Sequence, residues 1–419
     1  MNRLQSAWAG LSLARFTPDA QLLLMASGIF SVSFMGVQML LKILYLIRLD
    51  YSLTYIGIFS ATSSLAYSLM SLPSGALGSR FGNRTVMLIG GVITILGMAL
   101  LPWVEFVPAH LHTLLPLVSQ VLVSGGWALF NVSLVPALMT VTTRQNRNRA
   151  FALNSTLRGL GAFVGTMVGG LLPSFFALLL SQTLAEAAPY RYALWVGALL
   201  GLLGLAPILR MRRVTYTVQQ DDSDESAAPF PIWPMALLIL HVYFGNSSVA
   251  LCQTFCSAYM DTDLHLSTAF IGFLTGIGQF VAIFAPLLAP RIAARFGNGR
   301  ILMVATLGAA LSMLPLTFGH DWASAGMGRL GLLVLSAIWQ PALQVFQMEL
   351  VASRWRSLAY GIMSMGMSLT FTSVSFGGGY VATQWGYQTL FLLGVGLSTA
   401  GALLMWAMLR GLRRQGRVI

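Results

Sequence analysis

The chain has few charged residues for its size. Only 9% of its 419 residues are Asp, Glu, Lys or Arg, whereas 56% are hydrophobic. Soluble globular domains carry about 25% charged residues. The composition therefore excludes an ordinary water-soluble domain and indicates a protein of the lipid bilayer.

Acidic residues are scarce, and they are absent from the middle of every long apolar run. All twelve Asp and Glu residues fall in predicted loops or at the ends of apolar segments. Transporters that exchange protons for cationic compounds usually depend on a buried carboxylate. The deep charges are cationic instead, Arg158 and the single lysine, Lys42. This distribution favours a substrate with an anionic or electron-rich group.

Signatures of catalysis are also lacking. The chain has no G-x-x-x-x-G-K-[ST] loop, no nucleophile elbow and no zinc-type spacing. Its two cysteines, Cys252 and Cys256, are four residues apart in an apolar run, which is typical of small buried residues rather than a disulfide or metal site. We therefore predict that the protein is not an enzyme and needs no cofactor or metal.

Long hydrophobic runs, by contrast, are abundant. A helix needs about 20 apolar residues to cross the hydrocarbon core of a bilayer. Cutting the chain at its polar turns leaves twelve segments, most of which reach that length: 20–47, 54–78, 85–103, 112–140, 150–180, 190–209, 233–258, 268–293, 300–318, 326–351, 357–382 and 388–409. The sequence predicts an all-α membrane protein with twelve transmembrane helices.

The basic residues indicate the orientation of these helices. If the N-terminus is cytoplasmic, nineteen of the 24 cations lie on the inner side and three on the outer side, with Lys42 and Arg158 inside the apolar segments. Cytoplasmic loops of membrane proteins carry such an excess of basic residues. The net charge of +12 is thus explained by topology, nucleic acid is not an expected partner, and both termini are predicted to be cytoplasmic.

A short basic turn occurs twice. Arg80 to Asn83 reads RFGN, and the same letters return at Arg295 to Asn298. The shift of 215 residues also superposes Ser52 on Ser267 and Gly57 on Gly272 without a gap. This register indicates two homologous halves.

The first copy of this turn resembles the loop between helices 2 and 3 of major facilitator superfamily transporters, whose pattern is G-x-L-x-D-R-x-G-R-R. The matching residues are Gly75, Leu77, Arg80, Gly82 and Arg84. Ser79 replaces the aspartate, and the second copy has Pro290 and Ala294 in place of the first glycine and the acid. The resemblance implies two pseudo-symmetric six-helix halves, a substrate site at mid-membrane and alternating access. It also implies gating contacts at the cytoplasmic side through Arg80, Arg84, Arg295 and Glu349.

A second resemblance lies in the fifth segment. Glycines at Gly161, Gly165, Gly169 and Gly170 resemble the G-x-x-x-G-P-x-x-G-G antiporter motif of drug-exporting members, with Thr166 in place of the proline. This resemblance implies efflux by antiport. Glycines four residues apart also let two helices approach closely, so a packing seam without transport meaning is the alternative.

Candidate substrate contacts are polar residues within apolar segments. Arg158 should lie about 13 Å deep, nine residues after Arg149, where it either contacts the substrate or is held by a structural ion pair or hydrogen bonds. Lys42 either reaches the interface through its aliphatic stem or faces the cavity. His241 is either a proton carrier or a neutral hydrogen-bonded group. The predicted path comprises Gln38, Lys42, Asn131, Arg158, His241, Gln340 and Gln344. Gln340 and Gln344 form, with Gln347, a stripe that either lines the path or bonds neighbouring helices.

The predicted organisation follows the apolar segments. We expect a cytoplasmic lead at 1–19, a six-helix half at 20–210, a charged cytoplasmic linker at 211–231, a second half at 232–409 and a basic tail at 410–419.

Together these features predict a secondary transporter that moves a small organic compound, with export favoured. Uptake or exchange of an organic anion and lipid or lysolipid flipping are the alternatives. Its expected partners are an anionic or amphipathic small molecule and the lipid bilayer. A coupling proton stays open, since Gln120 stands near where proton-coupled members carry an arginine. A monomer in a prokaryotic inner membrane is expected.

Overall fold

A computed structural model describes residues 16–142, 146–211, 230–351 and 355–414. Within these ranges, the side chains at 72, 79, 147–148, 286–291, 294, 356–358 and 413–414 are not described. The described elements are all helical. They divide into two compact units, residues 1–48 with 66–219 and residues 49–65 with 220–419. The predicted linker lies almost wholly outside the described residues.

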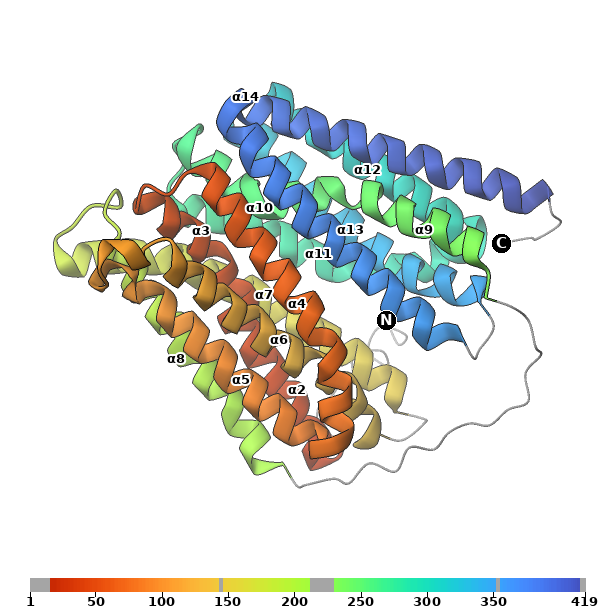
Figure 1. The fold of residues 1–419 in the computed structure, drawn as a ribbon, viewed down its shortest axis with the longest axis horizontal. Helices are drawn as coiled ribbons and strands as arrows, with labels where there is room; N and C mark the ends of the chain where they lie inside the picture. The colour runs from red at the N-terminus through yellow and green to blue at the C-terminus, as the bar shows by residue number, and fades with distance from the viewer. Residues whose placement is uncertain (1–15, 143–145, 212–229, 352–354, 415–419) are drawn as a thin grey trace, which may run out of the picture. The chain divides into compact units, whose positions relative to one another are not determined.

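The first unit holds the helices up to residue 210. They are α2 (Pro18–Ser31), the π-helix η2 (Val32–Gln38), α3 (Met39–Arg48), the later part of α4 (Leu53–Phe81), α5 (Asn83–Leu100), the 3₁₀ turns η3 (Leu101–Phe106) and η4 (Ala109–Leu111), α6 (Leu114–Thr140), α7 (Arg147–Leu180) and α8 (Ala188–Arg210). Within this unit α5 packs beside α6 and α8, as Figure 1 shows.

The second unit holds the remaining helices. They are α9 (Ile232–Gly245), α10 (Ser247–Thr262), α11 (Thr268–Phe296), α12 (Asn298–Phe318), α13 (Trp322–Leu350) and α14 (Arg356–Arg414). Helix α14 turns back on itself (Figure 1), because Gly386 has a positive φ of 78° that no right-handed helix allows. This break separates the last two predicted segments.

The predicted number of crossings is confirmed. In the described part of the chain, ten stretches are long and apolar enough to span a membrane, and the last of them, Ala359–Leu412, contains the break at Gly386. Counting that stretch as two and adding α4, a helix of 29 residues, gives the twelve helices. The protein is an all-α membrane protein.

The repeat seen in the sequence is also a repeat of local structure. A shift of 215 residues carries the bounds of α4, Leu53–Phe81, onto those of α11, Thr268–Phe296. At the start of these helices the Ser52 hydroxyl accepts a hydrogen bond from the Tyr55 amide at 3.2 Å, and the Ser267 hydroxyl accepts one from the Phe270 amide at 3.3 Å.

The ends of the two helices correspond as well. Gly82 has φ 83° and Gly297 has φ 81°, and each separates its helix from the next one. Only glycine adopts this region without strain. The glycine of each RFGN turn is therefore required by the backbone.

The glycine series of α7 packs against the first helix of its unit. A Cβ on Gly161 would lie 2.5 Å from the Gly28 carbonyl oxygen, and one on Gly165 would overlap Val32 and Gly36. Gly36 belongs to η2, so the π-helix lies where the two backbones touch. Small residues permit such close crossings in membranes.

Aromatic residues fill the core beside this crossing. The Trp127 ring lies 4.7 Å from that of Phe34 and 5.5 Å from that of Phe130, and Phe30 stacks on Phe130 at 4.7 Å. All four side chains are buried. This cluster holds α6 against α2 and η2 and fixes the face from which the site projects.

The first part of α4 belongs to the second unit. There Gly57 lies against the backbone of α14, where a Cβ would be 2.5 Å from the Ser375 carbonyl oxygen. The Thr54 and Thr383 hydroxyls are 2.9 Å apart. The predicted domain boundaries, which place all of α4 in the first half, stay a prediction.

Candidate functional site

The strongest candidate site is centred on Arg158 in the first unit. Arg158 lies on α7, nine residues after the start of the apolar span at Arg149, and hence about 13 Å along the helix. Its Nη1 donates a hydrogen bond of 2.8 Å to Oδ1 of Asn131 on α6. Two of the predicted path residues are thus brought together by direct contact.

Two further side chains position the guanidinium. Its Cζ lies 5.3 Å from the centre of the Trp127 ring, within the range of a cation–π interaction. Its Nη2 lies 3.9 Å from Sδ of Met35 on η2. Trp127 is itself fixed in the aromatic core, so the arginine rests on a rigid support.

Asn131 is held from its other side. Its Nδ2 donates to the Tyr67 hydroxyl on α4 at 2.9 Å, while its Oδ1 accepts from Arg158. The amide is therefore oriented at both ends. Arg158, Asn131 and Tyr67 are only partly buried within the unit. A partly exposed cation at this depth must meet water or a ligand, because exposure to lipid would be costly.

No carboxylate pairs with Arg158 among the described residues. An ion pair of the first unit lies elsewhere, between Arg191 and Glu105 at 2.7 Å. There the Tyr45 hydroxyl also donates to Glu105 at 2.7 Å. The protein thus satisfies one arginine with an acid and supports Arg158 with neutral groups, which leaves N–H donors for an anion.

The predicted substrate contacts on the first helix are more completely buried than Arg158. Gln38 is fully buried at the end of η2, and neither its Oε1 nor its Nε2 has a hydrogen-bond partner among the described residues. Lys42 is 5% exposed on α3. Neither side chain is hydrogen-bonded to Arg158, whose guanidinium bonds to Asn131 and Met35 among the described residues. Their role in the path stays a prediction.

The glutamine stripe of α13 divides into two parts. Gln340 and Gln344 are exposed, whereas Gln347 is buried, at 2% exposure, and its Oε1 lacks a partner among the described residues. Gln340 and Gln344 are therefore available to a ligand on one surface of the second unit.

His241 is packed inside the second unit. It is fully buried on α9, and its Nδ1 is 2.8 Å from the Gly401 carbonyl oxygen of α14. Its ring lies 6.2 Å from that of Trp339. This environment is that of a hydrogen-bonded core histidine, so we leave His241 out of the proposed substrate contacts.

The predicted gating residues have local partners. Arg84 donates to the Ile208 and Leu209 carbonyl oxygens at 3.0 and 2.7 Å, at the end of α8. Glu349 accepts from Nδ2 of Asn298 at 3.1 Å. The guanidinium groups of Arg80 and Arg295 each lie over the ring of the following residue, Phe81 and Phe296, at 5.3 and 5.2 Å. The role of these four residues in gating stays a prediction.

The site includes Tyr67, which the sequence did not single out. It reads only as one aromatic residue in an apolar segment, whereas Met35 shares a helix face with Gln38 and Lys42. The contribution of Tyr67 depends on which faces of four helices meet. A tyrosine at mid-segment is the one signal that could have suggested it.

These features define a class of protein: a helical membrane protein with several transmembrane segments, one of which carries an arginine held by neutral groups. The sequence model of the Major Facilitator Superfamily matches residues 23–354 and 235–418. The chain belongs to this superfamily, whose members transport small molecules and are generally not enzymes.

Comparisons with individual proteins are consistent with this membership. The chain is 37% identical to monocarboxylate transporter 11 of Mus musculus over 100 residues, 24% of this chain and 21% of that relative. It therefore aligns with only about a fifth of the length of this relative.

Solved structures resemble the whole fold. A mutant of the nucleoside transporter NupG superposes with a TM-score of 0.74 at 15% identity, covering 94% of this chain and all of that one. The xylose transporter XylE from E. coli, in an inward open conformation, superposes with a TM-score of 0.71 at 14% identity, covering 92% and 94% of the two chains. At these identities the likeness shows the fold alone.

Proposed function

We propose that the protein is a secondary transporter of small organic anions that works by alternating access, with Arg158 as the anion-binding group. Asn131 would contribute a neutral hydrogen bond to the substrate, while Gln340 and Gln344 of the second unit stay predicted path residues. We choose the organic-anion alternative because the Arg158 site favours an anionic substrate over export of an unspecified organic compound and over lipid flipping.

The observation that carries the proposal is the way Arg158 is supported. Its guanidinium is held by an amide, a ring face and a sulfur atom, and none of these neutralises its charge. An arginine has five N–H donors in a planar fork that matches a carboxylate. Only one donation to an oxygen atom occurs among the described residues. A carboxylate ligand would supply both the missing acceptors and the missing charge.

The partial relative supports the same substrate class. Its name specifies monocarboxylates, and a single carboxylate fits a single cation. Short monocarboxylates are thus the first compounds to test.

The predictions of export and of antiport have weaker support than the substrate class. The glycines of α7 that suggested them are used for close packing against α2 and η2, which importers and exporters need alike. We therefore keep the direction, the proton coupling, the prokaryotic inner membrane and the cytoplasmic termini as predictions.

The test is binding and uptake by purified protein in liposomes. Lactate and pyruvate serve as anions, lactamide as a neutral analogue and choline as a cation. A ligand at about 100 times its dissociation constant raises the free energy of unfolding by roughly 2.7 kcal/mol, which a thermal shift detects. Arg158→Gln should weaken anion binding at least about tenfold, corresponding to about 1.4 kcal/mol, and abolish anion uptake.

Two variants serve as controls. Arg158→Lys keeps the charge and loses the fork, so it should retain part of the anion binding. Arg300→Gln removes an exposed arginine at the start of α12 and should leave uptake unchanged. Uptake of choline by the wild type, or full anion binding by Arg158→Gln in a folded protein, would refute the proposal.

A further inference from the structure

A group of buried polar side chains in the second unit plays no part in the proposed substrate contacts. His241, Asn246, Thr306 and Trp339 are 0%, 4%, 1% and 5% exposed. Each has one side-chain atom without a hydrogen-bond partner among the described residues: Nε2, Nδ2, Oγ1 and Nε1 respectively. Buried polar atoms are nearly always satisfied, and a cluster of exceptions calls for a missing partner.

The four residues meet where one membrane helix is interrupted. Helix α9 ends at Gly245 and α10 begins at Ser247, with Asn246 between them. Gly245 lies close to both residues, since a Cβ on it would be 3.0 Å from Thr306 Cγ2 and 3.3 Å from His241 Cε1 and Thr306 Oγ1. His241 and Thr306 therefore approach the same point from α9 and α12.

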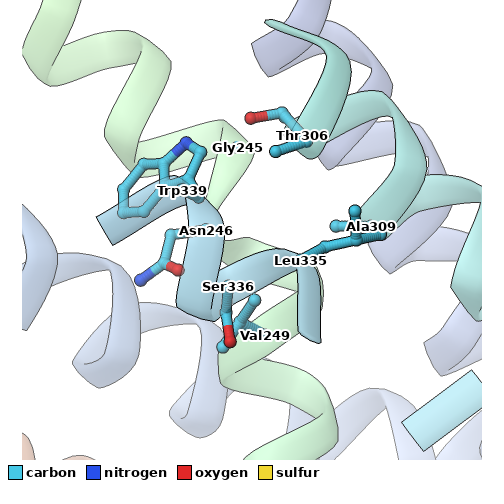
Figure 2. A pocket seen from close by; sticks show the side chains of 9 residues that line it. Gly245, Asn246, Val249, Thr306, Ala309, Leu335, Ser336 and Trp339 are labelled. Carbon is cyan, nitrogen blue, oxygen red and sulfur yellow. The ribbon is translucent and has the colours of Figure 1, made fainter. Parts of the chain in front are cut away.

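A small cavity occupies this point. Its volume is about 10 Å³, and its lining includes Gly245, Asn246, Thr306 and Trp339. Figure 2 shows the Thr306 hydroxyl and the indole nitrogen of Trp339 turned toward one another, whereas the amide group of Asn246 points away from both. A cavity needs roughly 10–15 Å³ of this kind to hold one water molecule.

The hydrogen-bonding character of the cluster follows from His241. Its Nδ1 lies 2.8 Å from the Gly401 carbonyl oxygen, which can only accept, so Nδ1 carries the proton. In the neutral ring Nε2 is then an acceptor. Trp339 Nε1 and Asn246 Nδ2 can only donate, whereas the Thr306 hydroxyl can do either.

We propose that this cavity is a binding site for one structural water molecule. The water accepts a hydrogen bond from Trp339 Nε1 and donates one to Thr306 Oγ1. It thereby joins α12 and α13 beside the interruption. A metal cation does not fit, because the indole presents an N–H donor, and an organic molecule is too large for the volume.

The site lies beside the interruption of the buried helix. Ordered water is one means by which membrane helices satisfy polar groups at a break. The neighbouring groups are already used, since the Ser398 hydroxyl accepts from the Ser248 amide at 3.2 Å and donates to the Gly245 carbonyl oxygen at 3.3 Å. The water would add a separate hydrogen-bonded bridge beside this network, between α12 and α13.

A double-mutant cycle tests the proposal, because the four side chains have no direct hydrogen bonds to one another through these atoms. Thr306→Val and Trp339→Phe each remove one bond to the water and keep most of the shape. Each should lower the melting temperature by roughly 2–4 °C. If both contact one water, the double variant should lose less than the sum.

The matched control uses another buried threonine of α12. The Thr317 hydroxyl donates to the Met313 carbonyl oxygen at 2.9 Å, and the residue is 2% exposed. Thr317→Val combined with Trp339→Phe should be additive. Additivity of the Thr306 and Trp339 variants as well would overturn the shared water.

A structure of the protein in lipid nanodiscs, at a resolution that shows ordered water, provides an independent test. Density for one water between Thr306 and Trp339 in the wild type, absent from Thr306→Val, is the expected result. An empty cavity in a well-resolved wild-type map would overturn the proposal. Density that appears only when lactate is added would also overturn it and would assign the site to substrate.

Discussion

Asp321 begins α13 and gives that end of the protein a measurable response to pH. Its carboxylate Oδ1 accepts from the Ser324 amide at 3.2 Å. Hydrogen bonding by the Ser324 side chain, and next by this amide, holds the pKa of Asp321 below its ordinary value of 3.8. The ionised form is thus favoured in the folded state.

The sign of the pH effect follows from linkage. A depressed pKa contributes stability that is present above the unfolded-state pKa and is lost as the pH falls through the folded-state pKa. The Asp321→Asn variant keeps a capping side chain but has no carboxylate to titrate. We expect it not to lose stability in this way as the pH falls. Thermal unfolding of both proteins between about pH 6 and pH 3 checks it. The difference in stability between the wild type and Asp321→Asn should change below about pH 4. A difference that stays constant would contradict the depressed pKa of Asp321.

Single residues show what the sequence could predict of the site and what it could not. The depth of Arg158 followed from the rise per residue of a helix, and Asn131 was a candidate because an amide in an apolar run needs a partner. Their mutual hydrogen bond depends on how α6 and α7 are rotated against each other. Rotation is set by packing, for example by Trp127 and Phe130 in the aromatic core, and an isolated sequence does not specify it.

Among the helices, length and order were the most predictable properties. Apolar runs bounded by arginines and turn residues gave ends within a few residues of those of α5, α6, α8 and α12. The π-helix η2 was not predictable, because nothing in its composition distinguishes it from an α-helix. Such bulges arise where helices press together and often occur at functional sites. Here η2 contributes Met35 to the arginine site.

The crossing of η2 and α7 should tolerate no added atoms. Gly165→Ala would force the two backbones apart and should lower the free energy of unfolding by about 1–3 kcal/mol. Gly377→Ala is the matched control, since a Cβ at this helical glycine of α14 meets nothing within 4 Å. It should be neutral or stabilising by up to about 1 kcal/mol. Unfolding in detergent measures both, and equal effects would contradict the packing role.

For the molecule as a whole, the division into units predicts how a cut chain behaves. Residues 49–65 lie in the first part of the sequence, yet they pack within the second unit. Co-expressed fragments 1–219 and 220–419 should therefore copurify. Gly57→Leu should weaken this association, because a Cβ there is already 2.5 Å from the Ser375 carbonyl oxygen.

The control for the cut chain lies on the same helix. Gly75→Leu adds the same side chain to α4 at a position where a Cβ meets nothing within 4 Å, so it should leave copurification unchanged. Fragments that never copurify, or that respond alike to both substitutions, would contradict the assignment of residues 49–65.

The contact of Gly36 with Gly165 has a consequence for how this protein can evolve. Where two side chains touch, a larger residue on one helix can be accommodated by a smaller residue on the other. Here each glycine meets backbone atoms, so no second mutation can remove the obstruction. Drift at both positions should be blocked independently, and descendants of this chain should keep both glycines long after neighbouring core residues have been exchanged.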